Sequence, residues 1–210
     1  MGQNFDYHRV AVNNGTNNFK YKEIQMKFNP INLQTQRLNL RKLTIDDVDD
    51  LYEIFSDELA LKYWSESAYT NIKQCSDMIE KNLEYWDEGT SMCLALEQKL
   101  DKKVIGTITV FAFHEQSRRA ELGYILSRKY WKTGLMSEAV DAAIKFSFNE
   151  LNLNRLEADI DPDNLGSAAL LKKYGFKLEG YLKERWIVND VVTDSELYGL
   201  LNPRRFKKSL

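Results

Sequence analysis

The sequence of 210 residues contains few of the residues that build metal sites and cross-links. It has two histidines, His8 and His114, and two cysteines, Cys75 and Cys93, and these four side chains do not cluster in the sequence. A zinc site needs several such ligands close together, so we expect no bound metal. A disulfide would need an oxidising compartment, which nothing in the sequence indicates.

Long apolar runs and an excess of positive charge are also missing. The formal net charge is -2, so we expect no direct nucleic-acid partner, although a local basic patch can still hold one phosphorylated ligand. No apolar run is long enough to span a bilayer, and residues 13–18 (NNGTNN) are polar rather than typical of a signal peptide. We therefore expect a cytoplasmic protein without a membrane partner.

What is present suits one globular domain, since 43% of the residues are hydrophobic and three are proline. Residues 1–32 show no sustained period and are predicted to be a flexible extension, with an extra strand or a partner-docking arm as the alternative. Residues 33–210 are predicted to form a single α/β domain. We find no internal repeat in them.

Apolar periodicity predicts the order β-α-α-β-β-β-α-β-α-β-β within this domain. The first helix should begin after Thr44, and a second should bury the stripe Ile72, Cys75, Ile79, Leu83 and Trp86. The remaining helices are expected at about 135–151 and from Asp163 or Asn164 to the terminator Gly175. The predicted strands are 38–43, 91–98, 104–113, 120–126, 155–160, 176–188 and 192–201.

A basic turn joins a strand to a helix at residues 130–139 (YWKTGLMSEA). A helix N-terminus offers unpaired N–H groups and partial positive charge, and Gly134 allows close approach of the backbone. Arg128, Lys129 and Lys132 add charge, so the turn suits a phosphate. It matches neither a Walker loop nor a GxGxxG fingerprint, and a helix start with solvated lysines is the alternative.

A second strand-to-helix junction follows, where the strand 155–160 leads into residues 163–176 (DNLGSAALLKKYGF). Two such junctions in succession place two helix N-termini at one edge of a sheet. Ligands bind at such an edge in α/β proteins.

Residues 36–201 resemble a GCN5-related N-acetyltransferase (GNAT), in the branch of RimJ/RimL-type ribosomal-protein alanine acetyltransferases. Four blocks carry the resemblance in order: QRLNLRKLTIDDVDDLYEIFSDELALKYW, AELGYILSRKYWKTGLMSEAV, NLGSAALLKKYGFKLEG and VTDSELYGLL. The resemblance implies a mixed, mostly antiparallel central sheet flanked by helices. Two of its strands would splay apart to form an acetyl-CoA cleft.

The resemblance also implies that the phosphate is the pyrophosphate of acetyl-CoA. Its ligands would be the backbone amides of Trp131, Lys132, Thr133, Gly134, Leu135, Met136 and Ser137, with Asn164 bonding the coenzyme arm. Of the superfamily pattern Gln/Arg-x-x-Gly-x-Gly/Ala only Gly134 matches, since Trp131 and Met136 hold the outer places. The oxyanion donor is expected to be the amide of Ile125 or Leu126, freed by a β-bulge around Gly123.

Two side chains are candidates for the chemistry. Strand alternation places Glu121 on one face with Gly123 and Ile125, where it could act as base, directly or through water; a cross-strand ion pair is the alternative. The resemblance makes Ser167 the acid beside the coenzyme sulfur, with a helix-interior serine bonded to its own backbone as the alternative.

This sequence lacks two residues of its relatives. Many members of the superfamily use a tyrosine acid where Leu171 stands. The branch has a proposed glutamate base where Trp186 stands, so the base role falls to Glu121 or water. Asn164 has a plain N-cap as its alternative.

We therefore predict an N-acetyltransferase that uses acetyl-CoA to modify a primary amine, foremost the N-terminal alanine or serine of a protein. A small amine acceptor (antibiotic, polyamine or amino acid) and a non-catalytic coenzyme-binding module are the alternatives. Acceptor contacts could come from Tyr63, Trp64, Trp186 and Tyr198, and from Glu184, Asp190, Asp194 and Glu196. The two closing strands could also pair across a homodimer.

Overall fold

The computed structural model describes residues 10–13, 19–22, 28 and 31–204. From Leu38 onward it confirms the predicted order of elements. The helices are α1 (Val48–Phe55), α2 (Ile72–Glu88), α3 (Leu135–Asn149) and α4 (Leu165–Lys173), with short 3-10 turns η1 (Ile45–Asp47) and η2 (Arg128–Tyr130). The strands of the main sheet are β3 (Asn32–Gln34), β4 (Leu38–Lys42), β5 (Ser91–Gln98), β6 (Val104–His114), β7 (Arg119–Leu126), β8 (Arg155–Ile160), β9 (Lys177–Val188) and β10 (Val191–Leu201).

The N-terminal part contains strands that the periodicity did not predict. The strand β3 adds an edge to the main sheet, while β1 (Val10–Asn13) and β2 (Phe19–Lys22) pair with each other in a separate sheet. The predicted boundary at residue 32 and the flexibility of the extension stay predictions. The end of the basic tail lies outside the described residues.

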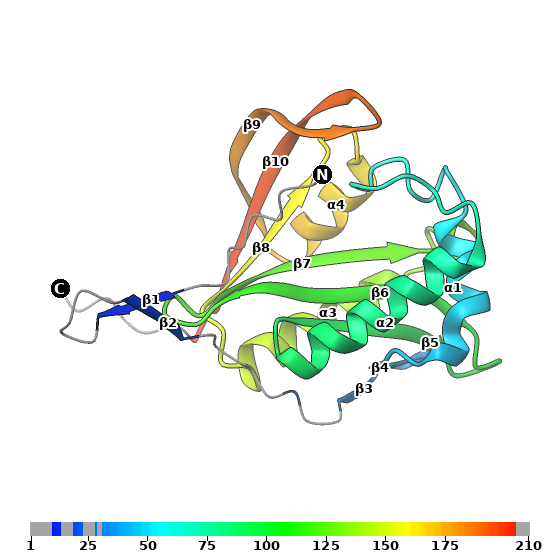
Figure 1. Ribbon diagram of the computed structural model, residues 1–210, viewed down its shortest axis with the longest axis horizontal. Coiled ribbons are helices and arrows are strands. Elements are labelled where there is room, and N and C mark those ends of the chain that lie inside the picture. Colours follow the sequence, from blue (N-terminus) through cyan, green and yellow to red (C-terminus); the bar gives the residue numbers. More distant parts are fainter. Residues whose placement is uncertain (1–9, 14–18, 23–27, 29–30, 205–210) are drawn as a thin grey trace.

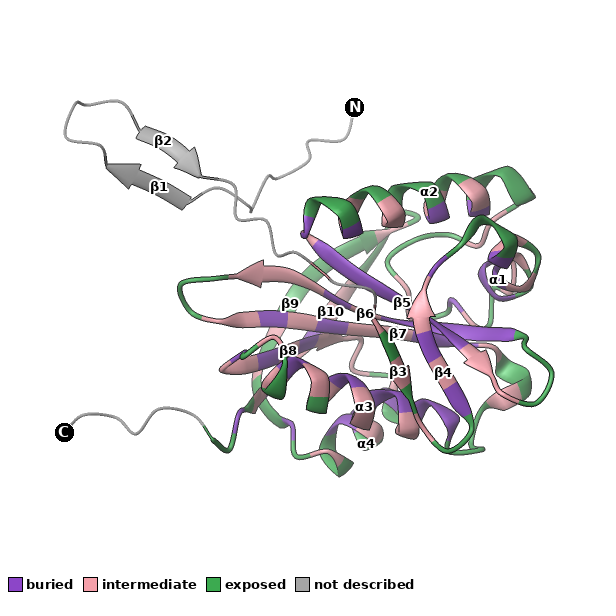
Figure 2. Ribbon diagram, turned by 90° about the horizontal axis from the view of Figure 1, so that it is seen from below, coloured by how far each residue is buried: buried purple, intermediate pink, exposed green. Residues whose placement is uncertain are grey.

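The eight strands follow the order β3-β4-β5-β6-β7-β8-β10-β9. Every neighbouring pair is antiparallel except β7 and β8, which are parallel. This confirms the mixed, mostly antiparallel sheet. Helices α1 and α2 cover one face, and α3 and α4 cover the other (Figure 2).

The buried apolar residues form two clusters. Of the predicted α2 stripe, Cys75 and Ile79 lie in one cluster and Trp86 in the other, all buried as predicted, but Ile72 is 45% exposed, so its place in the stripe was wrong. Within the described residues no helix is long and apolar enough to cross a bilayer.

The strands β7 and β8 pair only from Arg119↔Arg155 to Glu121↔Glu157. Beyond this point they diverge, β7 staying with β6 and β8 leaving with β10 and β9 (Figure 1). The expected bulge at Gly123 is wrong, because β6 and β7 stay in register from Gly106↔Leu126 to Phe111↔Glu121. The gap opens because β8 turns away, without an irregularity in β7 at Gly123.

The strands β6 and β7 lie so close at Gly106 that a larger residue there should lower the free energy of unfolding. A Cβ added to Gly106 would lie 2.2 Å from the Ile125 carbonyl oxygen, so Gly106→Ala should lower the free energy of unfolding by at least about 2 kcal/mol. Gly166 in α4 is the matched control, since its added Cβ would come no closer than 3.9 Å to a neighbour. Gly166→Ala should be neutral or stabilise by about 0.5–1 kcal/mol. Equal urea midpoints for the two variants would contradict this.

Candidate active site

The predicted phosphate turn ends at Gly134, which is the N-cap of α3 with a φ of 82°. Only glycine adopts this conformation without strain. Arg37 braces the turn: its Nη1 donates to the Thr133 carbonyl (3.1 Å) and its Nε to the Glu138 carboxylate (2.6 Å). Glu138 also accepts from the Thr35 hydroxyl at 2.7 Å. The turn is therefore held from the β3–β4 connection.

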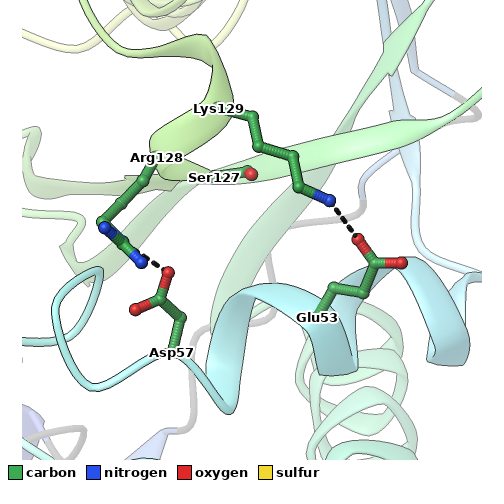
Figure 3. A pocket seen from close by; sticks show the side chains of 5 residues that line it. All are labelled: Glu53, Asp57, Ser127, Arg128 and Lys129. Atoms are coloured by element: carbon green, nitrogen blue, oxygen red, sulfur yellow. Dashed lines mark hydrogen bonds and ion pairs between the residues drawn. The ribbon is translucent and has the colours of Figure 1, made fainter.

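Two cations that the sequence assigned to the phosphate patch have other partners. Arg128 pairs with Asp57 at 2.5 Å and Lys129 with Glu53 at 2.9 Å, both carboxylates coming from α1 or its end (Figure 3). Together with Ser127 these four side chains line a depression of about 310 Å³. Both cations are therefore neutralised by carboxylates from the region of α1. Lys132, the third predicted cation, forms no ion pair among the described residues.

Backbone groups of β7 face the gap at alternate positions. The Ser127 N–H donates to the Ile105 carbonyl of β6 (2.8 Å), whereas the Leu126 carbonyl turns away from β6 and accepts from the Trp131 indole (2.9 Å). By the antiparallel alternation, the amides of Leu126 and Tyr124 point to the open side, and that of Ile125 points to β6. Between the two predicted oxyanion donors, the geometry therefore favours Leu126.

Helix α4 brings Asn164 and Ser167 to the other wall of the gap. Asn164 Oδ1 caps the helix by accepting from the Ser167 N–H (3.1 Å). The Ser167 hydroxyl is buried and lies 2.7 Å from the Tyr124 hydroxyl of β7, a partner that the sequence did not indicate. Leu171, at the place of the superfamily tyrosine, is fully buried in the core.

The first turn of α3 is tied to the end of α4. The Tyr174 hydroxyl donates to the Ser137 carbonyl at 2.6 Å, and Lys173 Nζ donates to the Ser137 hydroxyl at 2.6 Å. These bonds place the N-terminus of α3 against the C-terminal end of α4, on the same face of the sheet. Lys173 adds a cation beside the turn that the sequence reasoning missed.

Glu121 lies on the opposite face of the sheet from Tyr124, at the last β7–β8 pair. Burial raises the pKa of its carboxyl above the usual range, and the charges of Glu157 and Asp159 raise it further. Among the described residues Glu121 forms no ion pair, whereas Glu157 binds Arg119 and Arg155 at 2.8 and 2.7 Å. The cross-strand ion pair considered for Glu121 is therefore absent there.

Asp159 is a partly buried carboxylate of β8, two residues beyond Glu157, which the sequence did not single out. It accepts from the Ser195 hydroxyl and the Trp186 indole and pairs with Arg185 at 3.5 Å. Burial raises the pKa of Asp159, although the bonds from Trp186 and Arg185 oppose the rise. A carboxylate of β8 thus lies beside the place where the branch has a glutamate and this chain has Trp186.

The other acceptor candidates are scattered. Tyr198 is buried and donates to Glu196, and Trp64 packs edge-on against Phe55. Asp194 accepts from the Tyr181 hydroxyl and the Glu184 N–H, and Asp190 lies in the β9–β10 turn at positive φ. Among the described residues no group of three or more His, Cys, Asp or Glu side chains is placed to hold a metal ion.

The gap between two diverging strands, with a helix N-terminus on one side, agrees with a match to a known family. A profile described as "Acetyltransferase (GNAT) domain" matches residues 37–177. The chain belongs to the GNAT acetyltransferase family.

Individual relatives of this GNAT protein differ in what their names say of the acceptor. An uncharacterized N-acetyltransferase, p20 of Bacillus licheniformis, is 36% identical over 80% of this chain and 95% of its own. The spermidine N(1)-acetyltransferase of Escherichia coli (strain K12) is 26% identical (72% of this chain, 79% of its own). The [ribosomal protein uS5]-alanine N-acetyltransferase of that strain is 31% identical over smaller shares, 57% and 62%.

A solved structure has the same fold and a bound coenzyme. The microcin C7 self-immunity acetyltransferase MccE, in complex with acetyl-CoA and AMP, aligns with a TM-score of 0.73 at 22% identity. The alignment covers 80% of this chain and 94% of that one.

The role of Arg37 in holding the predicted phosphate turn can be tested. Arg37→Ala removes the bonds to Thr133 and Glu138, so we expect the dissociation constant of acetyl-CoA to rise about five- to tenfold, as for the loss of one or two hydrogen bonds. Lys73→Ala is the control, since Lys73 pairs with Asp77 on the exposed side of α2. Calorimetric titration measures both. Unchanged affinity in Arg37→Ala would contradict the assignment of this turn to the coenzyme.

Proposed function

We propose that this GNAT protein transfers the acetyl group of acetyl-CoA to a single primary amine, foremost the N-terminal alanine or serine of a protein. The observation that carries the proposal is the gap between β7 and β8, which opens at Glu121 on one face and at Ser167 on the other. A base and an acid are thus available to the two partners of an acetyl transfer. We keep the cytoplasm as the expected location.

The chain's own groups supply each requirement of the reaction. The α-amino group, with a pKa near 8, must lose a proton before it attacks, and Glu121 accepts that proton directly or through water. The new C–N bond forms before the C–S bond breaks, and the Leu126 amide donates to the oxyanion that exists between these two events. The nitrogen loses a second proton as the amide forms. The sulfur leaves beside Ser167 and gains one proton, so of the two protons lost by nitrogen one is balanced at the sulfur and the other passes through Glu121 to solvent.

Carboxylates on the acceptor side divide into paired and unpaired groups. Glu157 is neutralised by Arg119 and Arg155, and Asp159 is paired with Arg185. In the described part of the chain Glu121 forms no ion pair, and Glu184, Asp194 and Glu196 form none there either. An acceptor with one cation needs one free carboxylate, which Glu121 can supply, whereas a polyamine would also need those of β9 and β10.

A polyamine or another small amine is the second candidate, because the relatives include spermidine acetyltransferases. A panel of acceptors separates the two. Acetyl-CoA binding is measured by calorimetry, and thiol release is then followed with peptides that begin with Ala or Ser, the same peptides blocked at the N-terminus, spermidine and an aminoglycoside.

Release with the free peptides and not with the blocked ones supports the protein acceptor. Thiol release only with spermidine or the aminoglycoside would replace the protein N-terminus by a small amine as the proposed acceptor. Binding of acetyl-CoA without release from any acceptor would refute catalysis and leave a coenzyme-binding module.

The base role of Glu121 has its own test. Glu121→Gln should lower kcat/KM about hundredfold at pH 7, as for loss of a general base, and should remove the acidic limb of the wild-type pH profile. That limb should lie above the usual carboxyl range, because burial raises the pKa of Glu121. Glu80→Gln on the exposed surface of α2 is the control.

The same variant gives an opposite prediction for stability. A carboxyl whose folded-state pKa is raised binds its proton more tightly in the folded than in the unfolded chain, so its ionisation at neutral pH opposes folding. Glu121→Gln should therefore unfold at the wild-type temperature or above it. A loss of both activity and stability would contradict the base assignment.

A further inference from the structure

Two hydroxyl groups meet across the gap between β7 and β8, on the face of the sheet that α3 and α4 cover. Tyr124 reaches from β7, three positions after the last β7–β8 pair, and Ser167 from the first turn of α4. Their oxygens are 2.7 Å apart. Among the described residues neither hydroxyl has another hydrogen-bond partner, so the pair is isolated from the rest of the protein's polar groups.

The direction of this hydrogen bond follows from the chemistry of the two groups. A phenol is a stronger acid than an aliphatic alcohol and therefore the better donor. Burial raises the pKa of Tyr124 to about 12, with the bond to Ser167 opposing part of the rise, so the phenol keeps its proton at physiological pH. If Tyr124 donates its one proton to Ser167 Oγ, the serine proton is left without a partner in the protein.

We propose that Tyr124 is a positioning residue that donates to Ser167 and so directs the serine proton into the gap, toward the sulfur of the departing thiolate. The proposal rests on the function proposed above. It adds a phenol on β7 that acts on the leaving group through Ser167. On α4, where many members of the superfamily have a tyrosine, this chain has Leu171.

The rest of the site is compatible with this role. The Ser167 N–H donates to Asn164 Oδ1, which fixes the backbone from which the Ser167 hydroxyl extends. Tyr124 is partly buried and packs against the apolar core. A hydrogen bond beside such a core stabilises a thiolate more than one in open water does, because the effective dielectric constant is lower there.

Tyr124→Phe removes the phenol oxygen and keeps the ring. We expect kcat to fall about five- to tenfold, as for one lost hydrogen bond in the transition state, with the KM for acetyl-CoA changed by less than about twofold. Ser167→Ala should reduce kcat at least as much. Because Tyr124 acts through Ser167, the double variant should be no slower than Ser167→Ala alone.

A second measurement does not depend on the acceptor. The thiol of bound coenzyme A is titrated through the ultraviolet absorbance of its thiolate, in the wild type and in both single variants. The pair stabilises the thiolate, so each variant should raise the thiol pKa, and Ser167→Ala by at least as much as Tyr124→Phe.

Tyr69→Phe is the matched control. Tyr69 is also partly buried, with a pKa raised to about 12 by burial, but it stacks on Phe55 on the α1/α2 side of the sheet. Its substitution should change neither kcat nor the thiol pKa.

The outcomes separate the proposal from the function on which it rests. If the wild type turns over and Tyr124→Phe has the same kcat and the same thiol pKa as the wild type, the positioning role is refuted and the proposed function is not. A loss in the double variant equal to the product of the single losses also refutes it, since Tyr124 would then act without Ser167. A wild type that fails to bind acetyl-CoA refutes the proposed function, and the positioning role with it.

Discussion

Divergence of β7 from β8 after Glu121 is the constraint on which the candidate site depends. In a continuous sheet the amides of Tyr124 and Leu126 would bond to the next strand and be lost to a ligand. Here β8 departs with β10, to which it is paired from Arg155 to Ile160, so its backbone stays satisfied on that side. The amides of β7 that point to the gap beyond Glu121 are thus left without a partner on β8, and the only hydrogen bonds given up are those that β7 and β8 would have formed with each other there.

The same divergence also connects the two faces of the sheet. Side chains alternate along β7, so Glu121 and Ile125 lie on the α1/α2 face, and Tyr124 lies on the face of α3 and α4. Without the gap the sheet would separate the groups that serve the amine from those that serve the sulfur. With it, both partners of the transfer meet between the strands while each pKa is set by its own surroundings.

Sequence periodicity predicted the elements from Leu38 onward because alternating and helical patterns report burial directly. It failed for β3, which has three residues and no period, and for Ile72, since spacing alone does not tell whether a neighbour covers the first residue of a helix. Pairing of Lys129 with Glu53 and of Tyr124 with Ser167 joins residues 76 and 43 positions apart. Such contacts depend on how the elements pack. Strand alternation named Glu121 and the resemblance named Ser167, but neither could name Tyr124 as the partner of Ser167.

The turn that ends at Gly134, to which we assign the coenzyme as a proposal, shows why a departure from the family pattern can be tolerated. Backbone amides are supplied by every residue except proline, so Trp131 and Met136 can replace the usual side chains without removing a donor. Gly134 cannot be replaced in the same way, because its φ of 82° is a left-handed conformation. A site built from amides and a helix N-terminus also needs few cations, which agrees with Arg128 and Lys129 being paired to α1. Conformation, and not side-chain charge, is therefore the property of this turn that its sequence has to preserve.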